Sequence, residues 1–295
     1  MSSPLEPSRS LSRRPRTFEE LARLSDAELD VATGAALIAR DAYGRVDVDQ
    51  LLTSLARLAD GLPASAMAEL EPAEQARRLA AHVRDTLGFR GNEDEYHDPR
   101  NSLLSDVLER RLGIPITLAL VTTEIGTRAG VLARGVAFPG HFLVRVDDPA
   151  ALAEGPRAAP AALIDPFAGE VLERPALVAL LRRTLGEKAE LAPFHLLPAS
   201  PRGTLVRMLT NLKLVHLARR DLPRAHLALD RIVCLTPNAT SALRERGGLA
   251  DKLGATAAAR ADFERVLELE PEAKDASVLR AHITRLASTS RRALN

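Results

Sequence analysis

The chain has 295 residues, of which 46% are hydrophobic and 27% are charged, and its net charge is +1. This composition is typical of a globular protein of one to three domains, and the balanced charge gives no field that would attract nucleic acid or a membrane. A single cysteine excludes an intramolecular disulfide and favours a cytoplasmic location, and no apolar run approaches the roughly 20 residues of a membrane helix.

Residues 1–16 are rich in serine, proline and arginine and lack the apolar stretch of a signal peptide. We expect them to form a disordered basic tail. The arginines of this tail offer contacts to an acidic partner, but the composition favours a tail that is simply solvated.

Helical spacing dominates the chain from Thr17 to Gly88. Thr17 is an expected N-cap, because two glutamates follow it in the first turn. Gly61 and Pro63 separate the helices of this region, and Gly88 ends the last one. The region carries no catalytic signature of its own.

A polar loop, Phe89–Pro99, follows and contains four carboxylates and His97. Its acidic residues lack the alternating spacing and the turn glycine of a calcium loop, so we expect a solvated loop without a bound metal. A metal-dependent activity that uses His97 or His141 is the weakest of three functional hypotheses.

Two more helices are expected before the first strand. Asn101 or Ser102 should N-cap a helix that ends near Arg111. Pro115 fits the first turn of the next helix, where a missing N–H costs nothing, and this places Thr117 in that turn as well. The second helix is apolar on nearly all sides, so we expect it to be buried.

Four short strands are predicted next, and turn residues separate them: residues 136–138, 142–146, 162–165 and 170–172. His141 directly precedes the second of these strands, and Asp165 ends the third. Arg145 shares a strand face with His141, where it either adds positive charge to a site or is a solvated edge residue.

The chain beyond residue 203 is helical and contains a repeat. Pro237 matches Pro271 at an offset of 34 residues, and the same offset pairs Ala225 with Ala259. An offset of this length, with a small residue followed by a helix-ending proline, is the tetratricopeptide period. The small residue lets two helices approach closely, and the proline ends the second helix.

Gly247 occupies the small-residue position in the first helix of the second unit, but Lys213 stands at that position in the first unit. We therefore predict one regular repeat, one degenerate repeat and a capping helix from Ala273 to Ala287. Two repeats are fewer than a free-standing solenoid needs, so the segment should dock on the N-terminal domain. It serves either as a short peptide-binding groove or as a structural brace. Cys234 is expected on a partly exposed helix face, and nothing places it beside His141.

Thr117, His141 and Asp165 lie 24 residues apart, in the order of a nucleophile, a base and an orienting carboxylate. A helix N-terminus favours anionic sulfur or oxygen, a neighbouring histidine takes the proton, and a carboxylate fixes the imidazole tautomer. Taken singly, Asp165 is explained as a turn former and His141 as a residue at the edge of a sheet. The ordered set indicates a cleft.

Three motifs carry a family resemblance: Gly113–Thr117 before an apolar helix, Gly140–Phe142, and Ile164–Pro166. Together they resemble the transglutaminase-like fold. Further motifs, joined to the C-terminal repeat, narrow the match: Asn101-Ser102, Phe138–His141 and Leu163–Gly169. With these the chain resembles the bacterial SirB family (regulator of sirC expression type).

The resemblance implies an α+β protein. It has a helical N-terminal region, a papain- or transglutaminase-like core with a small antiparallel sheet, and an all-α tetratricopeptide-repeat region. The expected divisions are a disordered tail (1–16), a SirB-type transglutaminase-like domain (17–190), a linker (191–202) and the repeat region (203–290). In catalytic relatives such a core carries a Cys-His-Asp triad.

The position that matches the catalytic cysteine holds Thr117. A threonine hydroxyl is far less acidic than a thiol and is sterically hindered, and threonine nucleophiles mostly use the N-terminal amine as base, which an internal residue cannot do. We therefore expect Thr117, His141 and Asp165 to be the vestigial triad of a bacterial, cytoplasmic pseudoenzyme without a cofactor, which regulates or binds a protein or peptide partner through its repeats. The alternative is an amide or thioester hydrolase or acyltransferase, with Thr117 as nucleophile or water-positioning group, His141 as base and Asp165 as orienter.

Overall fold

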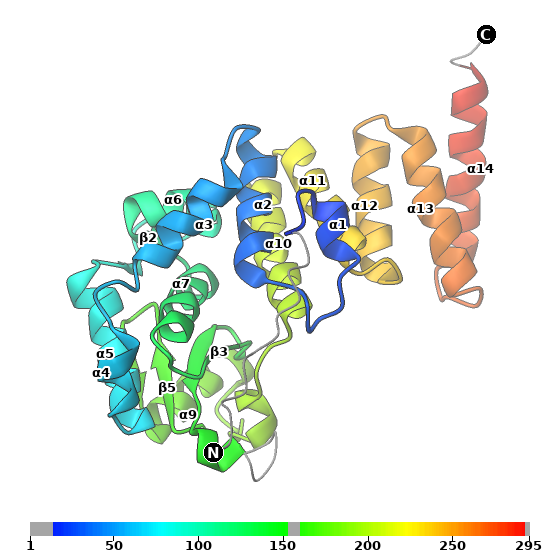
Figure 1. Ribbon diagram of the computed structural model, residues 1–295. Helices are drawn as coiled ribbons and strands as arrows, with labels where there is room; N and C mark the ends of the chain where they lie inside the picture. Colours follow the sequence, from blue (N-terminus) through cyan, green and yellow to red (C-terminus); the bar gives the residue numbers. More distant parts are fainter. Residues whose placement is uncertain (1–13, 153–159, 293–295) are drawn as a thin grey trace, which may run out of the picture.

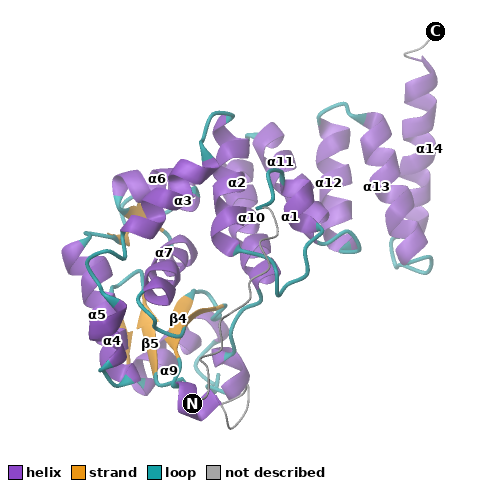
Figure 2. Cartoon of the chain, in the orientation of Figure 1, coloured by secondary structure: helices purple, strands orange, loops and turns teal. Residues whose placement is uncertain are grey.

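An antiparallel sheet of four short strands lies at one end of the protein, and helices surround it and extend away from it (Figure 2). The computed structural model describes residues 14–152 and 160–292. Most of the predicted basic tail, residues 1–13, lies outside the described residues. The predicted α+β class, with a small antiparallel sheet followed by an all-helical region, is confirmed.

The sheet has the strand order β3-β4-β5-β6, and each neighbouring pair is antiparallel. Its strands are β3 (Ala133–Val136), β4 (Leu143–Val146), β5 (Ala162–Asp165) and β6 (Glu170–Leu172). Because Val144 pairs with Ile164, the start of β4 and the end of β5 lie at the same end of the sheet. A short parallel ladder that periodicity did not predict joins β1 (Arg90–Gly91) to β2 (Leu112–Gly113).

The helices of the first part of the chain are α1 (Phe18–Ala22), α2 (Val31–Tyr43), α3 (Val48–Arg57), α4 (Ala64–Ala68), α5 (Pro72–Ala81), α6 (Leu104–Arg110), α7 (Pro115–Arg128), α8 (Pro149–Leu152) and α9 (Arg174–Leu185). A π-helical turn, η1 (His82–Thr86), and a 3-10 turn, η2 (Pro99–Ser102), lie between them. The predicted N-cap at Thr17 is confirmed, since its side chain accepts a hydrogen bond from the Glu20 N–H at 3.1 Å.

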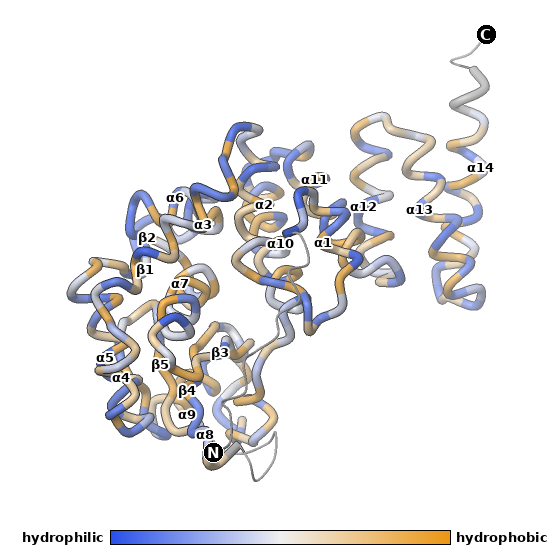
Figure 3. The backbone as a smooth tube through the Cα atoms, in the orientation of Figure 1, coloured by the Kyte–Doolittle hydropathy of each residue, from blue (hydrophilic) through white to orange (hydrophobic). Residues whose placement is uncertain are grey.

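Alternate strand positions enter two apolar layers. Val144 and Ile164 are buried in the main core with α5 and α7, whereas Leu143 and Leu163 are buried in a second cluster with α9. Both faces of the sheet are therefore covered. Figure 3 shows β4 and β5 among the more apolar segments of the chain. The predicted burial of α7 is confirmed, because the helix lies between the sheet and the N-terminal helices.

The position of Arg145 contradicts both expectations for this residue. It is neither a positive charge beside His141 nor a solvated edge residue. Its side chain is 1% exposed, and its guanidinium donates to the Asp147 carboxylate and, at 2.6 Å, to the Leu196 carbonyl. Asp147 also accepts from Arg134 at 2.6 Å. The prediction was wrong because it assumed an open sheet face, whereas α9 and the residues after it cover that face.

The prediction that Asn101 or Ser102 is the N-cap of α6 is also wrong. Leu103 occupies that position without a side-chain cap, because the η2 turn precedes the helix. Asn101 is buried instead, and its Nδ2 donates to the Glu95 carbonyl at 2.7 Å. Its Oδ1 accepts from Asn92 at 3.0 Å. Asn101 therefore ties down the polar loop that the sequence suggested to be solvated.

Five helices form the C-terminal array, α10 (Pro201–Ala218), α11 (Leu222–Leu235), α12 (Thr240–Lys252), α13 (Thr256–Leu269) and α14 (Ala276–Arg292). Each helix packs on the next, and the array extends away from the sheet (Figure 1). The small-residue role of Gly247 is confirmed, because a Cβ atom there would lie 2.8 Å from the Phe263 ring. Lys213, the departure from the pattern, is ion-paired with Glu245 at 2.5 Å.

Helix α10 belongs to both parts of the protein. Its Leu205 and Met208 are fully buried, and Leu205 packs so closely on α2 that a Cβ atom at Gly34 would lie 2.5 Å from it. Helix α11 also contacts the N-terminal helices. Its Arg231 is ion-paired with Glu19 of α1 and with Asp41 of α2, each at 2.6 Å. These contacts confirm that the repeat segment docks on the N-terminal domain.

Residues 191–202, the expected linker, pack along the sheet. They contain a 3-10 turn, η3 (Pro193–Leu196), and the Ala199 N–H donates to the Gly135 carbonyl at 2.8 Å. One apolar cluster contains buried residues from both sides of this segment, from Phe18 to Leu286. The domain limits at residues 190 and 203 therefore stay a prediction.

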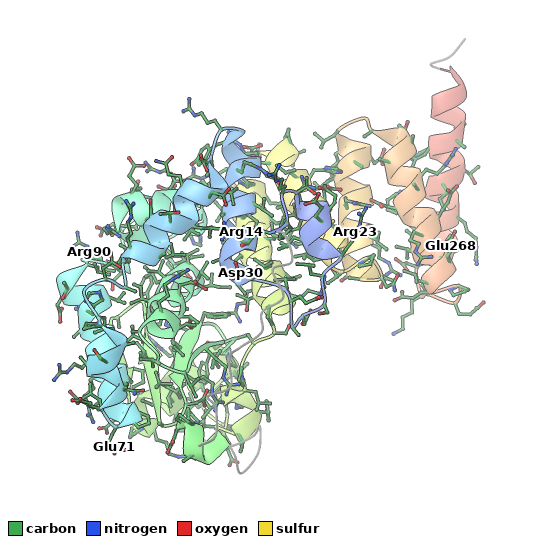
Figure 4. All side chains as sticks on the ribbon, viewed as in Figure 1. Arg14, Arg23, Asp30, Glu71, Arg90 and Glu268 are labelled. Carbon is green, nitrogen blue, oxygen red and sulfur yellow. The ribbon has the colours of Figure 1, made fainter. Side chains whose placement is uncertain are left out.

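The described end of the basic tail is tied to the first helices. Arg14, labelled in Figure 4, is ion-paired with Asp49 of α3 at 2.5 Å. The Arg16 N–H donates to Glu20 at 2.6 Å. These contacts involve only the last residues of the segment that was expected to be disordered.

Within the described ranges, no helix combines the length and the apolar character that a bilayer crossing requires.

The packing of the array predicts opposite results for two adjacent glycines of α12. Gly247→Leu should lower the free energy of unfolding by about 1–3 kcal/mol, because the new side chain collides with Phe263. Gly248→Leu is the matched control and should not lower it, since nothing lies within 4 Å of a Cβ atom there and leucine favours a helix over glycine by about 0.5–1 kcal/mol. Urea unfolding measures both, and equal effects would contradict this packing.

Candidate functional site

A tight turn places His141 at the start of β4. The His141 N–H donates to the Phe138 carbonyl at 3.0 Å, Pro139 occupies the second turn position, and Gly140 the third with φ of 69°. This is the pattern of a type II turn, whose third position requires the positive φ that glycine adopts freely. A Cβ atom at Gly140 would also collide with Thr184 of α9. The Pro-Gly pair therefore fixes the direction of the His141 side chain.

A second turn fixes Asp165 at the end of β5. Its Oδ1 atom accepts from the backbone N–H of Phe167 at 2.8 Å and of Ala168 at 3.2 Å. The Gly169 N–H closes the turn on the Asp165 carbonyl at 2.7 Å. Such an Asx turn holds the carboxylate rigidly against its own backbone.

The two turns bring His141 and Asp165 together. His141 Nε2 lies 2.8 Å from Asp165 Oδ1, and both side chains are only slightly exposed, at 13% and 12%. Burial disfavours the Asp165 anion, but the hydrogen bond and charge of His141 and the two backbone N–H groups outweigh it, so the pKa of Asp165 lies below its ordinary value. Nδ1 of His141 has no hydrogen-bond partner within the described residues.

Thr117 is not part of this hydrogen-bonded pair. Its side chain is fully buried in the first turn of α7, and its Oγ1 donates to the Asn101 carbonyl at 2.7 Å. The same oxygen accepts from the Ile114 N–H at 3.2 Å. The hydroxyl therefore caps the helix and anchors the η2 turn, and no hydrogen bond joins it to His141.

Aromatic rings border the His141 imidazole. Phe167 lies edge-on to it, with 6.3 Å between the ring centroids, and Tyr96 lies edge-on to Phe167 at 6.0 Å. Phe167 rests on the β1–β2 ladder, because a Cβ atom at Gly91 would lie 2.5 Å from its ring. Tyr96 comes from the polar loop that Asn101 ties down.

Arg207 completes these surroundings from α10. Its Nη2 donates to the His141 carbonyl at 2.8 Å, and its guanidinium lies 5.7 Å from the centroid of the Phe142 ring. The sequence does not single out Arg207, because no short motif connects it to a histidine 66 positions earlier. Tyr96 and Phe167 were likewise overlooked, although both lie in segments singled out by their polarity or their turn residues.

Other candidate residues lie apart from this pair. His97 stacks edge-on against Tyr96 at 5.4 Å, and no group of three or more His, Cys, Asp or Glu side chains arranged to hold a metal occurs among the described residues. Cys234 is half-buried, as expected, and lines a hollow with Arg23 and Arg202. Burial raises the pKa of its thiol.

The fold has relatives of known family. A model of the transglutaminase-like superfamily matches residues 49–210, which include the whole sheet, His141 and Asp165. The chain belongs to the transglutaminase-like superfamily. A tetratricopeptide-repeat model matches residues 212–284 of this superfamily member.

Individual relatives match the chain over most of their length. The chain is 37% identical to a UPF0162 protein of Xylella fastidiosa, over 92% of this chain and 95% of that protein. It is 34% identical to a UPF0162 protein of Pseudomonas aeruginosa, over 79% and 87%. It is 25% identical to protein SirB1 of Salmonella typhimurium, over 72% and 77%. The predicted SirB-like combination of a transglutaminase-like domain and repeats is confirmed.

The environment of Asp165 predicts a pH-dependent loss of stability in Asp165→Asn. The variant keeps an acceptor oxygen but loses the charge, so it should lower the free energy of unfolding by about 1–3 kcal/mol at pH 7. Because the pKa of Asp165 is lower in the folded protein, its contribution is present above the unfolded value of about 3.9 and is lost as the pH falls further.

Urea unfolding between about pH 7 and pH 3 tests this linkage. The difference between the wild type and Asp165→Asn should shrink at the acid end. Glu170→Gln, at the exposed cross-strand neighbour of Asp165, is the control and should show no such trend. A difference that stays constant across the range would contradict the assigned hydrogen bonds.

Proposed function

We propose that this SirB-like protein is a non-catalytic, cytoplasmic regulator that binds a protein or peptide partner through its repeats. The observation that carries the proposal is the state of the Thr117 hydroxyl. It is fully buried, and the acceptors within its reach are the main-chain carbonyls of Asn101 at 2.7 Å and Ile114 at 3.1 Å. A nucleophilic hydroxyl must instead share its proton with the base, so the transglutaminase-like domain is degenerate in this respect.

The repeat array supports the assignment of a partner. Large apolar side chains are exposed on it, Leu214 at 55% on α10 and Val278 at 57% on α14. Tetratricopeptide arrays present such helix faces to peptides and proteins. The unpaired Cys234 thiol agrees with a reducing, cytoplasmic location.

A second candidate function rests on the ordered His141–Asp165 pair. A histidine held by a carboxylate orients a water for attack on an acyl carbon, and Nδ1 of His141 has no hydrogen-bond partner in the described part of the chain. In this hydrolase the attacking group is water. Thr117 then has only a structural role, because its hydroxyl is hydrogen-bonded to the Asn101 carbonyl.

Affinity capture with the whole chain tests the repeat interaction. A truncation before α10 is unsuitable, because it removes the buried Leu205 and Met208 from the core. Leu214→Glu and Val278→Glu should each reduce the recovery of specific partners by about tenfold, since a charge in a desolvated contact typically costs 1–2 kcal/mol or more. Quantitative mass spectrometry of cross-linked complexes measures the recovery.

Leu185→Glu is the matched control, because Leu185 is 56% exposed and lies at the end of α9, outside the array. It should recover the same partners as the wild type. Equal recovery by all three variants would exclude the surfaces around Leu214 and Val278 as the binding surface.

A further inference from the structure

A half-buried arginine without an acidic partner lies beside the His141–Asp165 pair. Arg207 is held by main-chain oxygens, at 2.8 Å from the His141 carbonyl and 3.4 Å from that of Phe138. It forms no ion pair within the described residues. Burial lowers the pKa of Arg207, yet an arginine remains charged at neutral pH.

Three other largely buried arginines are neutralised by carboxylates of the chain itself. Arg145, Arg231 and Arg246 are each ion-paired with a carboxylate, those of Asp147, Asp41 and Asp262. Arg111 also lacks a carboxylate, but its guanidinium covers the Phe89 ring at 4.5 Å and its Nη1 is shut off from solvent. Burying a charge without a counter-charge is unfavourable. The exception at Arg207 therefore indicates a counter-charge that comes from outside the chain.

Tyr96 supplies a second hydrogen-bond donor at the same place. Its hydroxyl makes no hydrogen bond within the described residues, although the ring packs edge-on against Phe167. Phe167 packs edge-on against both the Tyr96 ring and the His141 imidazole, and Arg207 donates to the carbonyl of the same histidine. Burial raises the pKa of Tyr96 although the charge of Arg207 opposes this, so the hydroxyl keeps its proton. A guanidinium and a phenol together match the two oxygens of a carboxylate.

We propose that Arg207, Tyr96 and His141 form a binding site for the carboxylate of a peptide, with Phe167 as its apolar wall. His141 contributes its ring nitrogen Nδ1, which has no hydrogen-bond partner within the described residues. The carboxylate belongs to an acidic side chain or to a C-terminus. This site does not depend on partner binding by the repeats, so the two proposals fail separately.

Nuclear magnetic resonance of tyrosine rings tests the site directly. The chain contains two tyrosines, so 13C-tyrosine labelling of the whole protein reports on Tyr96, with Tyr43 as an internal reference. The Tyr43 hydroxyl is bonded to Asp106. The probes are N-acetyl-leucine, N-acetyl-leucinamide, N-acetylglutamic acid α-amide and inorganic phosphate.

Both carboxylates should shift the Tyr96 signals in a saturable way, and the leucinamide should not. Tighter binding of N-acetyl-leucine than of the glutamate probe assigns the site to a peptide C-terminus, and the reverse order assigns it to an acidic side chain. Arg207→Met should raise the dissociation constant at least about tenfold, and Tyr96→Phe, which keeps the ring, by about threefold to tenfold.

Arg219→Met is the control for general loss of positive charge, because Arg219 is exposed at the end of the same helix. It should change the dissociation constant less than about twofold. The proposal is overturned if leucinamide binds as well as N-acetyl-leucine, if Arg207→Met and Arg219→Met behave alike, or if phosphate binds more tightly than both carboxylates. It is also overturned if no probe saturates below about 100 mM, where even a single charged hydrogen bond would be occupied.

Discussion

The burial of one face of α10 holds the two parts of the protein together. Leu205 and Met208 enter the core beside α2, and removing either side chain should destabilise the fold by about 2–5 kcal/mol. The same helix carries Arg207, which donates to the carbonyl of His141. The repeats and the turn that presents His141 therefore share one structural element, and a change in α10 is felt in both.

The His141–Asp165 pair depends on local turn chemistry more than on the sheet. A Pro-Gly turn aims His141, and an Asx turn supplies two N–H groups to the Asp165 carboxylate before His141 binds it. The pair therefore forms without help from the hydroxyl of Thr117, the residue predicted to occupy the nucleophile position. Thr117 links α7 to the Asn101 turn, so the residue retains a structural role that a reactive group could not share.

Patterns with a short sequence range predicted most of the fold. Alternation and turn residues predicted three of the strands, but the first strand lies at Ala133–Val136 and not at the predicted residues 136–138, because Phe138 belongs to the turn before His141. The Pro115 position predicted the start of α7, and the 34-residue offset predicted the close packing at Gly247. Each of these signals arises from a period or a turn residue, so it is present in the sequence itself. The family resemblance drew on the same local motifs.

The errors concern contacts between distant segments. Arg145 was placed on an open face because the sequence does not show that α9 covers it, and Asn101 was given a capping role although it ties down a loop. Arg207 was missed because its partner is a main-chain carbonyl, which carries no residue type. Such residues are recognised only when the packing of the whole chain is known.

The central claim is that Thr117 is a buried structural residue and not a nucleophile beside His141. The most direct measurement is the rate at which iodoacetamide alkylates Thr117→Cys in a Cys234→Ser background. The new thiol should react at least about tenfold more slowly in the folded protein than in urea, because position 117 is closed to solvent. Faster alkylation in the folded protein than in urea, abolished by His141→Ala, would show an activated nucleophile and contradict the account.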